Sequence, residues 1–470
     1  MTTPRTIPPR PAGDRTDAVV VGAGIAGLLA AHVLARRHQV TLLDGDRIPG
    51  TPDRRSGVPQ DGHVHALFAQ GLRTVEALLP GFTAELCRRG GLRIDVCADL
   101  AIATPHGWGT RFPSNLRVVG ASRPLIEAVI REHVLDNPRV RLLERHRVHS
   151  LTGDERHVSA VVVHDLDTGQ GTAVPAALVV DASGRGSRLP NWLTGLGCPP
   201  VPETTVDAHI GYATRLYRLP AGPRGWRALY ALPSGPAVTR GGVLAPVEDD
   251  RWIVSLSGAG TDRPPSHEDA FLPFARTLAT PAIADALAGG TPLSGVVRSH
   301  STANRRRHLD RARHFPGNLL VLGDAACAFN PVYAQGMTVA ARSARLLRSC
   351  LASGASTRRF HHRQKHLHDT PWLLATTADL RFPHTTGGPP SPHQRALGRY
   401  LDRVLAAGTH DARAQAAFLN VLNMVHPPVT LLAPRVALSA LRTRASGPSL
   451  TAPPPDPEPS TNCQGAPHVH

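Results

Sequence analysis

The chain has 470 residues, 41% of them hydrophobic, and a formal net charge of +16 at neutral pH. This length predicts two or three lobes with a sizeable core. The sequence contains no apolar run of about 18 residues, so no membrane span is predicted. The positive charge comes almost wholly from dispersed arginines, with Lys365 the only lysine, so nucleic-acid binding is not expected.

The chain begins with residues 1–16, which are rich in Pro and Arg and carry no apolar signal segment, so we expect a disordered arm. Six scattered cysteines show no C-x-x-C spacing, which excludes a disulfide framework and a zinc site and predicts no metal. This cysteine usage fits a cytoplasmic protein. From Ser446 onward the Pro, Ser and polar content predicts a second disordered segment, 446–470.

The motif on which the rest depends is a glycine-rich turn between a strand and a helix. The apolar run Ala18–Val21 leads directly into Gly22-Ala-Gly24-Ile-Ala-Gly27, and helical periodicity follows over Leu28–His38. In this G-x-G-x-x-G setting Gly22 permits a tight turn, Gly24 lets the backbone approach a pyrophosphate, and Gly27 lets the helix pack closely.

A second strand, Gln39–Leu43, ends in Asp44, about 20 residues after the first glycine. An acidic side chain at this position accepts hydrogen bonds from the ribose hydroxyls of an adenosine. The strand, the glycine turn, the helix and the acidic residue thus follow one another at the expected spacing, which predicts a dinucleotide-binding site.

Farther along, Gly62–Leu79 shows helical periodicity, and Ser122 precedes a helix that reaches about Val134. Three strands of a small antiparallel unit are predicted at Val140–Arg147, His157–Asp165 and Thr172–Val180. Alternating segments between residues 204 and 257 predict a second sheet, and Phe360–Leu441 is mainly helical.

Two further stretches repeat the pattern of an apolar strand followed by a Gly/Asp turn. One is Asp181-Ala-Ser-Gly-Arg-Gly-Ser-Arg188. The other runs from the strand Asn318–Leu322 through Gly323-Asp324 to Asn330-Pro331-Val-Tyr333-Ala-Gln335-Gly336-Met337. A carboxylate beside glycine at a strand end can accept hydrogen bonds from a polyol. Gln335-Gly336, at a predicted helix N-terminus, can direct backbone N–H groups at a negatively charged ring edge.

These three stretches resemble the motifs of FAD-dependent monooxygenases related to p-hydroxybenzoate hydroxylase, over roughly residues 17–350. The resemblance implies that Asp324 holds the flavin ribityl chain and that the loop Asn330–Met337 lies beside the flavin ring. It also implies that Arg123, in its Ser-Arg-x-Leu pattern, contacts the cofactor near its phosphates, with Arg55 a weaker candidate. Asp181 and Gly323 complete the implied cofactor site.

The implied fold is α/β: a Rossmann-type FAD-binding domain with an inserted β-sheet substrate domain and a helical C-terminal region. The FAD-binding domain is expected to be discontinuous, formed by residues 17–200 and 295–355. The β-rich substrate domain is expected at 201–294, and the helical region at 356–445.

A closer likeness is to the bacterial flavin epoxidases of polyether biosynthesis, relatives of squalene epoxidase. It rests on Arg55-Ser-Gly-Val-Pro-Gln60, the His-x-His that follows, Asp181–Arg188 and Phe329–Met337. Ala334 departs from the pattern, because a glycine usually stands before the Gln-Gly pair. The membrane-anchoring helices of squalene epoxidase are missing here.

The resemblance implies an epoxidase that oxidises an alkene of a polyene or polyketide in secondary metabolism, such as antibiotic biosynthesis, through a flavin hydroperoxide. The cofactors implied are FAD, O2, and NAD(P)H or a partner flavin reductase as electron source. Epoxidation needs no protein base, so we expect backbone groups of Asn330, Pro331 and Gly336 to position the flavin, beside an elongated apolar pocket between the lobes.

The alternative is hydroxylation of a phenolic polyketide, which needs a base. His63 and His65, at the start of the helix predicted at Gly62–Leu79, are candidates that would line the pocket, together with Tyr333. Halogenation is disfavoured, because the lysine in the first lobe and the Trp-x-Trp-x-Ile-Pro stretch of flavin halogenases are both missing. A flavin-binding scaffold without turnover is a further, weaker alternative.

Overall fold

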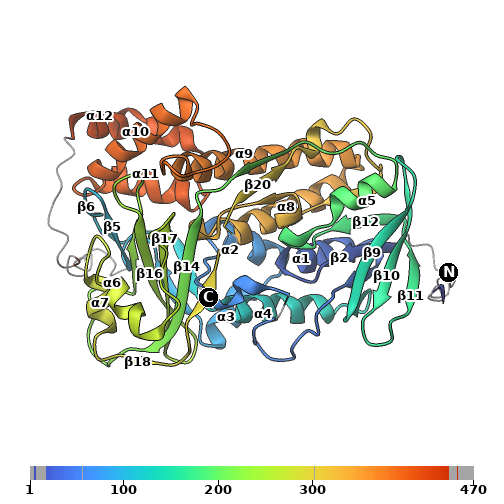
Figure 1. Ribbon diagram of the computed structural model, residues 1–470, viewed down its shortest axis with the longest axis horizontal. Coiled ribbons are helices and arrows are strands. Elements are labelled where there is room, and N and C mark those ends of the chain that lie inside the picture. Colours follow the sequence, from blue (N-terminus) through green and yellow to red (C-terminus); the bar gives the residue numbers. More distant parts are fainter. Residues whose placement is uncertain (1–4, 7–16, 56, 301, 444–452, 454–470) are drawn as a thin grey trace, which may run out of the picture. The chain divides into compact units, whose positions relative to one another are not determined.

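The computed structural model describes residues 5–6, 17–55, 57–300, 302–443 and 453 (Figure 1). The chain forms two compact units. Unit 1 comprises Met1–Arg89, Ala121–His209 and Ser299–Pro389, and unit 2 comprises Gly90–Gly120, Ile210–Arg298 and Pro390–His470. This division differs from the expected one, in which residues 90–120 belonged to the nucleotide-binding domain and 356–445 stood apart.

Unit 1 is built on a five-stranded parallel sheet, which confirms the predicted Rossmann-type architecture. In spatial order its strands are β21 (Leu319–Val321), β12 (Leu178–Asp181), β2 (Asp17–Val21), β3 (Gln39–Leu43) and β8 (Val140–Leu143). Val21 is level with Leu43 on one side and with Asp181 on the other, and Asp181 is level with Val321. Four strands therefore end in one row, and each of the three motifs leaves the sheet from that row.

Helices cover this sheet because its strands are apolar on both faces. α1 (Ile25–Leu34) and α4 (Arg123–Leu135) pack against its strands. Further helices pack on these two: α8 (Gly336–Ala352) on α1, α2 (Ala69–Leu78) on α8, and α3 (Phe82–Arg88) on α4. α1 lies along β2 and packs against both α4 and α8 (Figure 1), so it is buried almost all round and is less amphipathic than expected.

Two predicted helix boundaries are wrong. α1 starts three residues early, within the glycine motif, and ends at Leu34, because residues 35–38 form a turn before β3. The helix expected over Gly62–Leu79 begins only at Ala69, because a short 3-10 turn, Pro59–Gly62, and an extended segment precede it.

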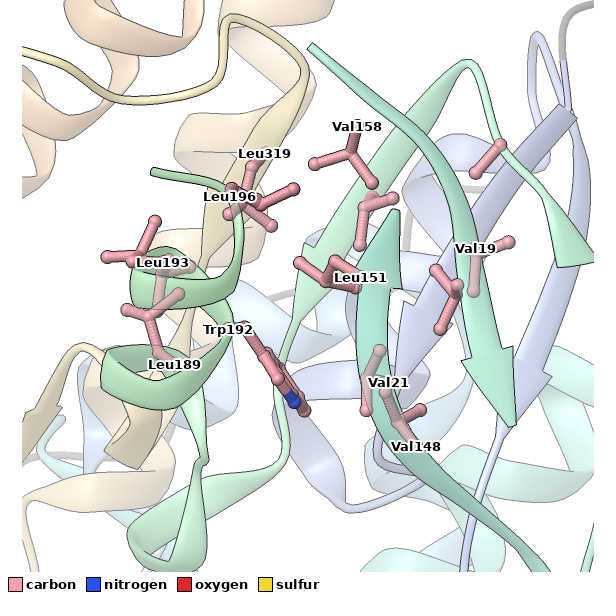
Figure 2. Packing of buried hydrophobic residues seen from close by; sticks show 14 of the residues in the cluster. Val19, Val21, Val148, Leu151, Val158, Leu189, Trp192, Leu193, Leu196 and Leu319 are labelled. Atoms are coloured by element: carbon pink, nitrogen blue, oxygen red, sulfur yellow. The ribbon is translucent and has the colours of Figure 1, made fainter. Parts of the chain in front are cut away.

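An antiparallel sheet and α5 (Leu189–Gly195) enclose one hydrophobic core of unit 1. The sheet consists of β9 (His146–Gly153), β10 (Val158–Asp165) and β11 (Gly171–Pro175), with β1 (Arg5–Thr6) added parallel to β11. Val19, Leu151, Val158 and Trp192 meet in this core (Figure 2). Burying each such side chain contributes about 1.5–3 kcal/mol.

The predicted antiparallel unit is confirmed, but its strands divide differently. Residues 140–147 split at Arg145, which has φ 58°, so β8 joins the parallel sheet and β9 starts the antiparallel one. Residues 172–180 split likewise into β11 and β12. Arg5–Thr6 forms a strand within the arm expected to be disordered; residues 1–4 and 7–16 lie outside the described part, as does most of the expected disordered tail.

Unit 1 contains a third sheet, whose strands are β13 (Glu203–Val206), β20 (Asn304–Arg307) and β22 (Cys327–Ala328). α9 (Thr357–Asp379) packs against this sheet at β20. α9 also covers β21, the last strand of the parallel sheet: the Val321 N–H donates to Nε2 of His361 at 3.3 Å, and Nε2 of Gln364 donates to the Val321 carbonyl at 3.1 Å. Two side chains thus complete the hydrogen bonds of the edge strand.

His361 makes the stability of unit 1 dependent on pH. Burial lowers its pKa from 6.5 to about 3, whereas the unfolded chain protonates near 6.5. The unfolded state therefore binds more protons in this range, and this contribution to the unfolding free energy falls by about 1.4 kcal/mol for each pH unit below 6.5. Denaturant titrations of wild-type protein should show lower stability at about pH 5 than at about pH 7.

The variant His361→Gln keeps an acceptor that does not titrate. Between about pH 7 and pH 5, its unfolding free energy should therefore fall by about 2 kcal/mol less than that of wild-type protein. His362→Gln is the matched control, because His362 is the exposed neighbour on the same helix. A His361→Gln variant as acid-sensitive as His362→Gln would contradict this assignment.

Unit 2 is built on an eight-stranded sheet. Its strands are β5 (Leu100–Thr104), β6 (Gly107–Trp108), β14 (Ile210–Arg218), β15 (Ala228–Ala231), β16 (Arg240–Val247), β17 (Arg251–Ala259), β18 (Thr291–Pro292) and β19 (Val297–Ser299). β5 pairs parallel with β15, which places residues 90–120 in this unit. A small ribbon joins β4 (Leu92–Asp95) to β7 (Arg117–Gly120).

Helices complete unit 2. α6 (Phe271–Ala275) and α7 (Ala282–Leu287) pack on the large sheet around Phe271 and Leu256. α10 (Pro392–Ala407), α11 (Ala412–Leu422) and α12 (Pro434–Arg442) pack on one another, which confirms the helical C-terminal region. None of the described helices has the length and apolar run needed to cross a bilayer.

Candidate functional site

The first motif forms a tight turn that leaves little room at two of its three glycines. Gly22 has φ 96°, and a Cβ there would lie 2.6 Å from the Ala182 carbonyl oxygen. A Cβ at Gly27 would lie 1.8 Å from the Gly22 carbonyl oxygen. At Gly24, by contrast, no described heavy atom lies within 4 Å of such a Cβ. Gly24 is also the N-cap of α1 and offers no capping side chain, so the helix N-terminus faces open space.

Asp44 closes this turn from the end of β3. Its Oδ2 accepts the Ala23 N–H at 2.7 Å, and Nη2 of Arg55 lies 2.8 Å from the same oxygen. Arg55 is buried and also donates to the Ala23 carbonyl at 3.1 Å. The guanidinium therefore holds both the turn and the predicted ribose-binding carboxylate in place.

A buried carboxylate, Glu127 of α4, links the two predicted arginines. It lies 2.7 Å from Arg55 and 3.1 Å from Arg123, and Arg123 also pairs with Asp61. Burial opposes the charge on Arg55, but Asp44 and Glu127 outweigh it and raise the pKa of this guanidinium. Carboxylates of the protein itself thus balance the positive charges of both arginines. The sequence predicts cofactor contacts for these two residues and does not predict these ion pairs.

The second motif is organised by Asp181, whose carboxylate is fully buried. It accepts hydrogen bonds from the Ser183 N–H at 3.0 Å, the Ser183 hydroxyl at 2.5 Å and the Ser187 hydroxyl at 2.6 Å. Its oxygens are therefore occupied by its own turn. Arg185 extends from this turn, donates to the carbonyls of Ala303 and Phe329, and lies 3.9 Å from the Asp324 carboxylate.

The third motif meets the first at Gly323. This residue has φ 60°, and a Cβ there would lie 2.7 Å from the Ala26 side chain of α1. Asp324 follows, partly buried, and burial raises its pKa while Arg185, Arg123 and Arg305 act in the opposite direction. The carboxylate predicted to hold a polyol is therefore influenced by three arginines, one from the second motif, one from the start of α4 and one from β20 (Asn304–Arg307).

The loop after this motif is fixed by buried polar side chains. The Asn330 N–H donates to Oδ1 of Asn304 at 2.8 Å, and Oδ1 of Asn330 accepts the Val332 N–H at 3.2 Å. Pro331 has no N–H, and its carbonyl accepts the Ala334 N–H at 2.9 Å. Of the three residues expected to present backbone groups, Asn330 and Pro331 therefore stabilise the loop itself.

Ala334 occupies a left-handed conformation, φ 52° and ψ 24°, where glycine is normally favoured. Replacing Ala334 with glycine removes this strain but increases the entropy of the unfolded chain. The net effect should be a gain of about 0.5–1 kcal/mol in unfolding free energy, measured by denaturant titration.

The opposite sign is expected for Ala416→Gly, because Ala416 lies within α11 in an ordinary helical conformation. Equal destabilisation by the two substitutions would show that Ala334 is not strained.

The N-terminus of α8 follows the loop at Gln335, Gly336 and Met337. A Cβ at Gly336 would lie 3.6 Å from Oδ1 of Asp324, which brings the helix start next to the third motif. The Gln335 side chain is buried, makes no capping hydrogen bond, and its Oε1 has no hydrogen-bond partner among the described residues. Met337 is also buried.

His63 and His65 lie in the extended segment before α2. His63 is buried, and Nδ1 of His65 lies 2.9 Å from the His63 carbonyl. Burial, His65 and Arg54 lower the pKa of His63 to about 3, and burial also lowers the pKa of His65. Both rings are neutral at pH 7 and are weak bases.

These observations fit a dinucleotide cofactor. Two helix N-termini, those of α1 and α8, carry no capping side chain, the space at Gly24 is open, and the buried Gln335 oxygen is unpartnered. Such N-termini favour anionic groups. All of the sequence-predicted site residues lie in unit 1.

Three buried residues of the site were not predicted: Asp61, Glu127 and Asp379. The sequence does indicate the pairing of Glu127 with Arg123, because the two residues are four positions apart on one face of α4. It does not indicate the side-chain pairings of Asp61 with Arg123 and of Asp379 with Tyr333, because these partners are 62 and 46 residues apart in the sequence.

Comparison with known proteins agrees with this assignment. The family profile described as FAD binding domain matches residues 15–363. Protein Rv3254 of Mycobacterium tuberculosis is 30% identical over 424 residues, covering 87% of this chain and 89% of the relative. Kynurenine 3-monooxygenase of Salinispora arenicola is 26% identical over 372 residues, covering 72% and 73%. Among solved structures, the flavin-dependent brominase Bmp2 superposes with a TM-score of 0.64 at 11% identity, over 87% of this chain and 93% of that chain.

The fold and the site thus define a flavoprotein of the FAD-dependent monooxygenase class. The chain belongs to the FAD binding domain family, whose profile covers most of its length. The likeness to the brominase, at this low identity, shows the shared fold alone.

Proposed function

We propose that this protein uses FAD to epoxidise an electron-rich alkene of a polyene or polyketide. The single observation that carries the choice of epoxidation is the environment of the three side chains predicted as candidate bases, His63, His65 and Tyr333. His63 and His65 have lowered pKa values, and the Tyr333 hydroxyl donates to a buried carboxylate, Asp379. An alkene has no proton to lose, so its oxidation needs none of these groups.

In this proposal the residues of unit 1 hold the cofactor in three places. The Gly22–Gly27 turn and the α1 N-terminus bind the pyrophosphate, and Asp44 accepts the ribose hydroxyls. Asp324 binds the ribityl chain. Gln335 and Gly336 lie against the flavin ring, where the uncapped N–H groups of α8 stabilise negative charge.

Bound FAD supplies oxygen activation once NAD(P)H or a partner reductase has supplied electrons. The residues of this chain orient the cofactor, and the buried loop that follows Asp324 excludes water from one side of it. Arg55 and Glu127 act indirectly, because they hold the pyrophosphate turn and Asp44 in position.

Aromatic hydroxylation is the second candidate, and the specific observation that favours it is the similarity to kynurenine 3-monooxygenase. The brominase likeness does not favour halogenation in the same way, because it shows the fold alone. The sole lysine of the sequence, Lys365, lies on α9, with its Nζ 3.9 Å from Asp310.

The test is product analysis with purified, FAD-loaded protein. Panels of polyenes and of phenols are each incubated with oxygen and with NADH, NADPH or an added flavin reductase. Epoxidation predicts a product heavier by one oxygen that opens to a diol in acid, and predicts that His63→Gln and His65→Gln retain turnover. A phenolic product, lost in either variant with flavin content intact, would instead establish hydroxylation. Oxygen consumption with neither panel would favour a non-catalytic scaffold.

A further inference from the structure

Asp379, the last residue of α9, is a fully buried carboxylate that the proposed mechanism does not use. Its Oδ1 accepts the Tyr333 hydroxyl at 2.5 Å, and its Oδ2 accepts Nδ2 of Asn304 at 2.6 Å. Nδ2 of Asn330 lies 3.3 and 3.4 Å from the two oxygens. Groups from β20 and from the loop before α8 therefore converge on one side chain.

The partners of Asp379 are neutral, so nothing in this cluster balances its charge directly. Burying a carboxylate is costly unless its lone pairs are satisfied, and three donors satisfy them here. Burial raises the pKa of Asp379 to about 6, the hydrogen bonds from Tyr333, Asn330 and Asn304 act to lower it, and the charge of Asp207 raises it further. The fold thus retains a carboxylate whose burial is energetically unfavourable, and such a residue points to a functional role.

The loop that Asp379 contacts leads directly to the N-terminus of α8. Asp379 binds it at two points, Asn330 and Tyr333, and also fixes Asn304, whose Oδ1 accepts the Asn330 N–H. One residue later Ala334 adopts its left-handed conformation, which the loop would not keep without such restraints.

We propose that Asp379 is a positioning residue: its carboxylate holds the Asn330–Tyr333 loop and thereby sets the position of the α8 N-terminus against the flavin ring. This inference rests on the proposed placement of FAD. It adds a residue of α9, outside the three motifs, to the cofactor site.

The arrangement has a consequence at acidic pH. Protonation of Asp379 removes the negative charge that strengthens its three hydrogen bonds and adds an O–H among these donors, so the loop is held less firmly. The titratable groups that face Asp379 are Tyr333, from the loop, and Asp207, which follows β13. FAD affinity should therefore fall as the pH drops through about 6.

The experiment compares wild-type protein with Asp379→Asn and with Asp369→Asn. This control neutralises a carboxylate of the same helix that is 45% exposed and pairs with Arg306, and the asparagine oxygen can still accept from that guanidinium. FAD dissociation constants and the visible spectrum of the bound flavin are measured between about pH 5 and pH 8. We expect Asp379→Asn to bind FAD about tenfold more weakly at neutral pH, with a shifted flavin band. Its affinity should change less with pH than that of wild-type protein, and Asp369→Asn should behave as wild type.

Tyr333→Phe removes one donor and keeps the carboxylate, so it should cost about threefold in FAD affinity and retain the pH dependence. If Asp379→Asn does not fold, Tyr333→Phe still tests the inference. An unchanged flavin spectrum and an unchanged FAD affinity in this variant would overturn it. So would an Asp379→Asn variant with the wild-type spectrum and pH profile. Wild-type protein that takes up no FAD would overturn the proposed placement of the cofactor itself.

Discussion

Replacing Gly27 with alanine is expected to unfold or severely destabilise unit 1, whereas the same change at Gly24 is expected to spare the fold and abolish tight FAD binding. The added methyl group at Gly27 would lie 1.8 Å from the Gly22 carbonyl oxygen, and neither backbone can yield without moving α1 off the sheet. We expect a loss of at least about 3 kcal/mol in unfolding free energy.

At Gly24 the backbone is extended, φ −77° and ψ 179°, and the methyl group would enter open space. The unfolding free energy of the apoprotein, measured by thermal unfolding, should therefore change by less than about 1 kcal/mol. FAD affinity, measured by quenching of flavin fluorescence, should fall by about 10- to 100-fold, because the methyl group occupies the space proposed for the pyrophosphate.

A matched control is Gly195→Ala, which adds a methyl group to open space at the exposed end of α5. It should raise the unfolding free energy by about 0.5–1 kcal/mol, as expected for alanine in place of glycine within a helix, and should leave FAD affinity unchanged. If Gly24→Ala bound FAD as tightly as Gly195→Ala, the pyrophosphate could not lie at this turn.

The second large effect is expected from Glu127→Ala. The side chains of Glu127 and Arg55 are 2% and 3% exposed, and that of Arg123 is 8% exposed. Removing the shared carboxylate leaves two buried guanidinium groups short of a partner, which should cost about 3–5 kcal/mol in unfolding free energy. FAD affinity should fall as well, because Arg55 would no longer be held against the first motif.

The control, Glu132→Ala, removes a carboxylate from the same helix that is 43% exposed and pairs with Arg89. Its cost should stay within about 1 kcal/mol, because solvent screens an exposed pair. Equal effects of the two substitutions in denaturant titrations would mean that the buried cluster contributes no more than a surface ion pair.

Much of the nucleotide-binding architecture could be predicted because it depends on local patterns. Each strand of the parallel sheet is a short apolar run, and Gly22, Asp44 and Gly323 follow such runs directly. Parallel strands end at the same edge, so motifs far apart in the sequence had to meet there. The register of β2, β3, β12 and β21 confirms this expectation.

The features that were missed depend on pairings between distant segments. Tyr333 and Asp379 are 46 residues apart, and no periodicity links them. The placement of residues 90–120 in unit 2 depends on the pairing of β5 with β15, which no local pattern predicts. The hydrogen bonds that the Ser183 and Ser187 hydroxyls donate to Asp181 are likewise not evident from the sequence, which predicts only that this acidic residue at a strand end binds the cofactor.

The covering of β21 by α9 also bears on how the protein would fail in mild acid. An uncovered sheet edge is a template on which a strand from another molecule can pair, and natural proteins block such edges. Here the block is a neutral imidazole and an amide, those of His361 and Gln364. When α9 leaves this edge, His361 regains its ordinary pKa of 6.5 and binds a proton, so mild acid favours states in which β21 is uncovered and can pair with a second molecule.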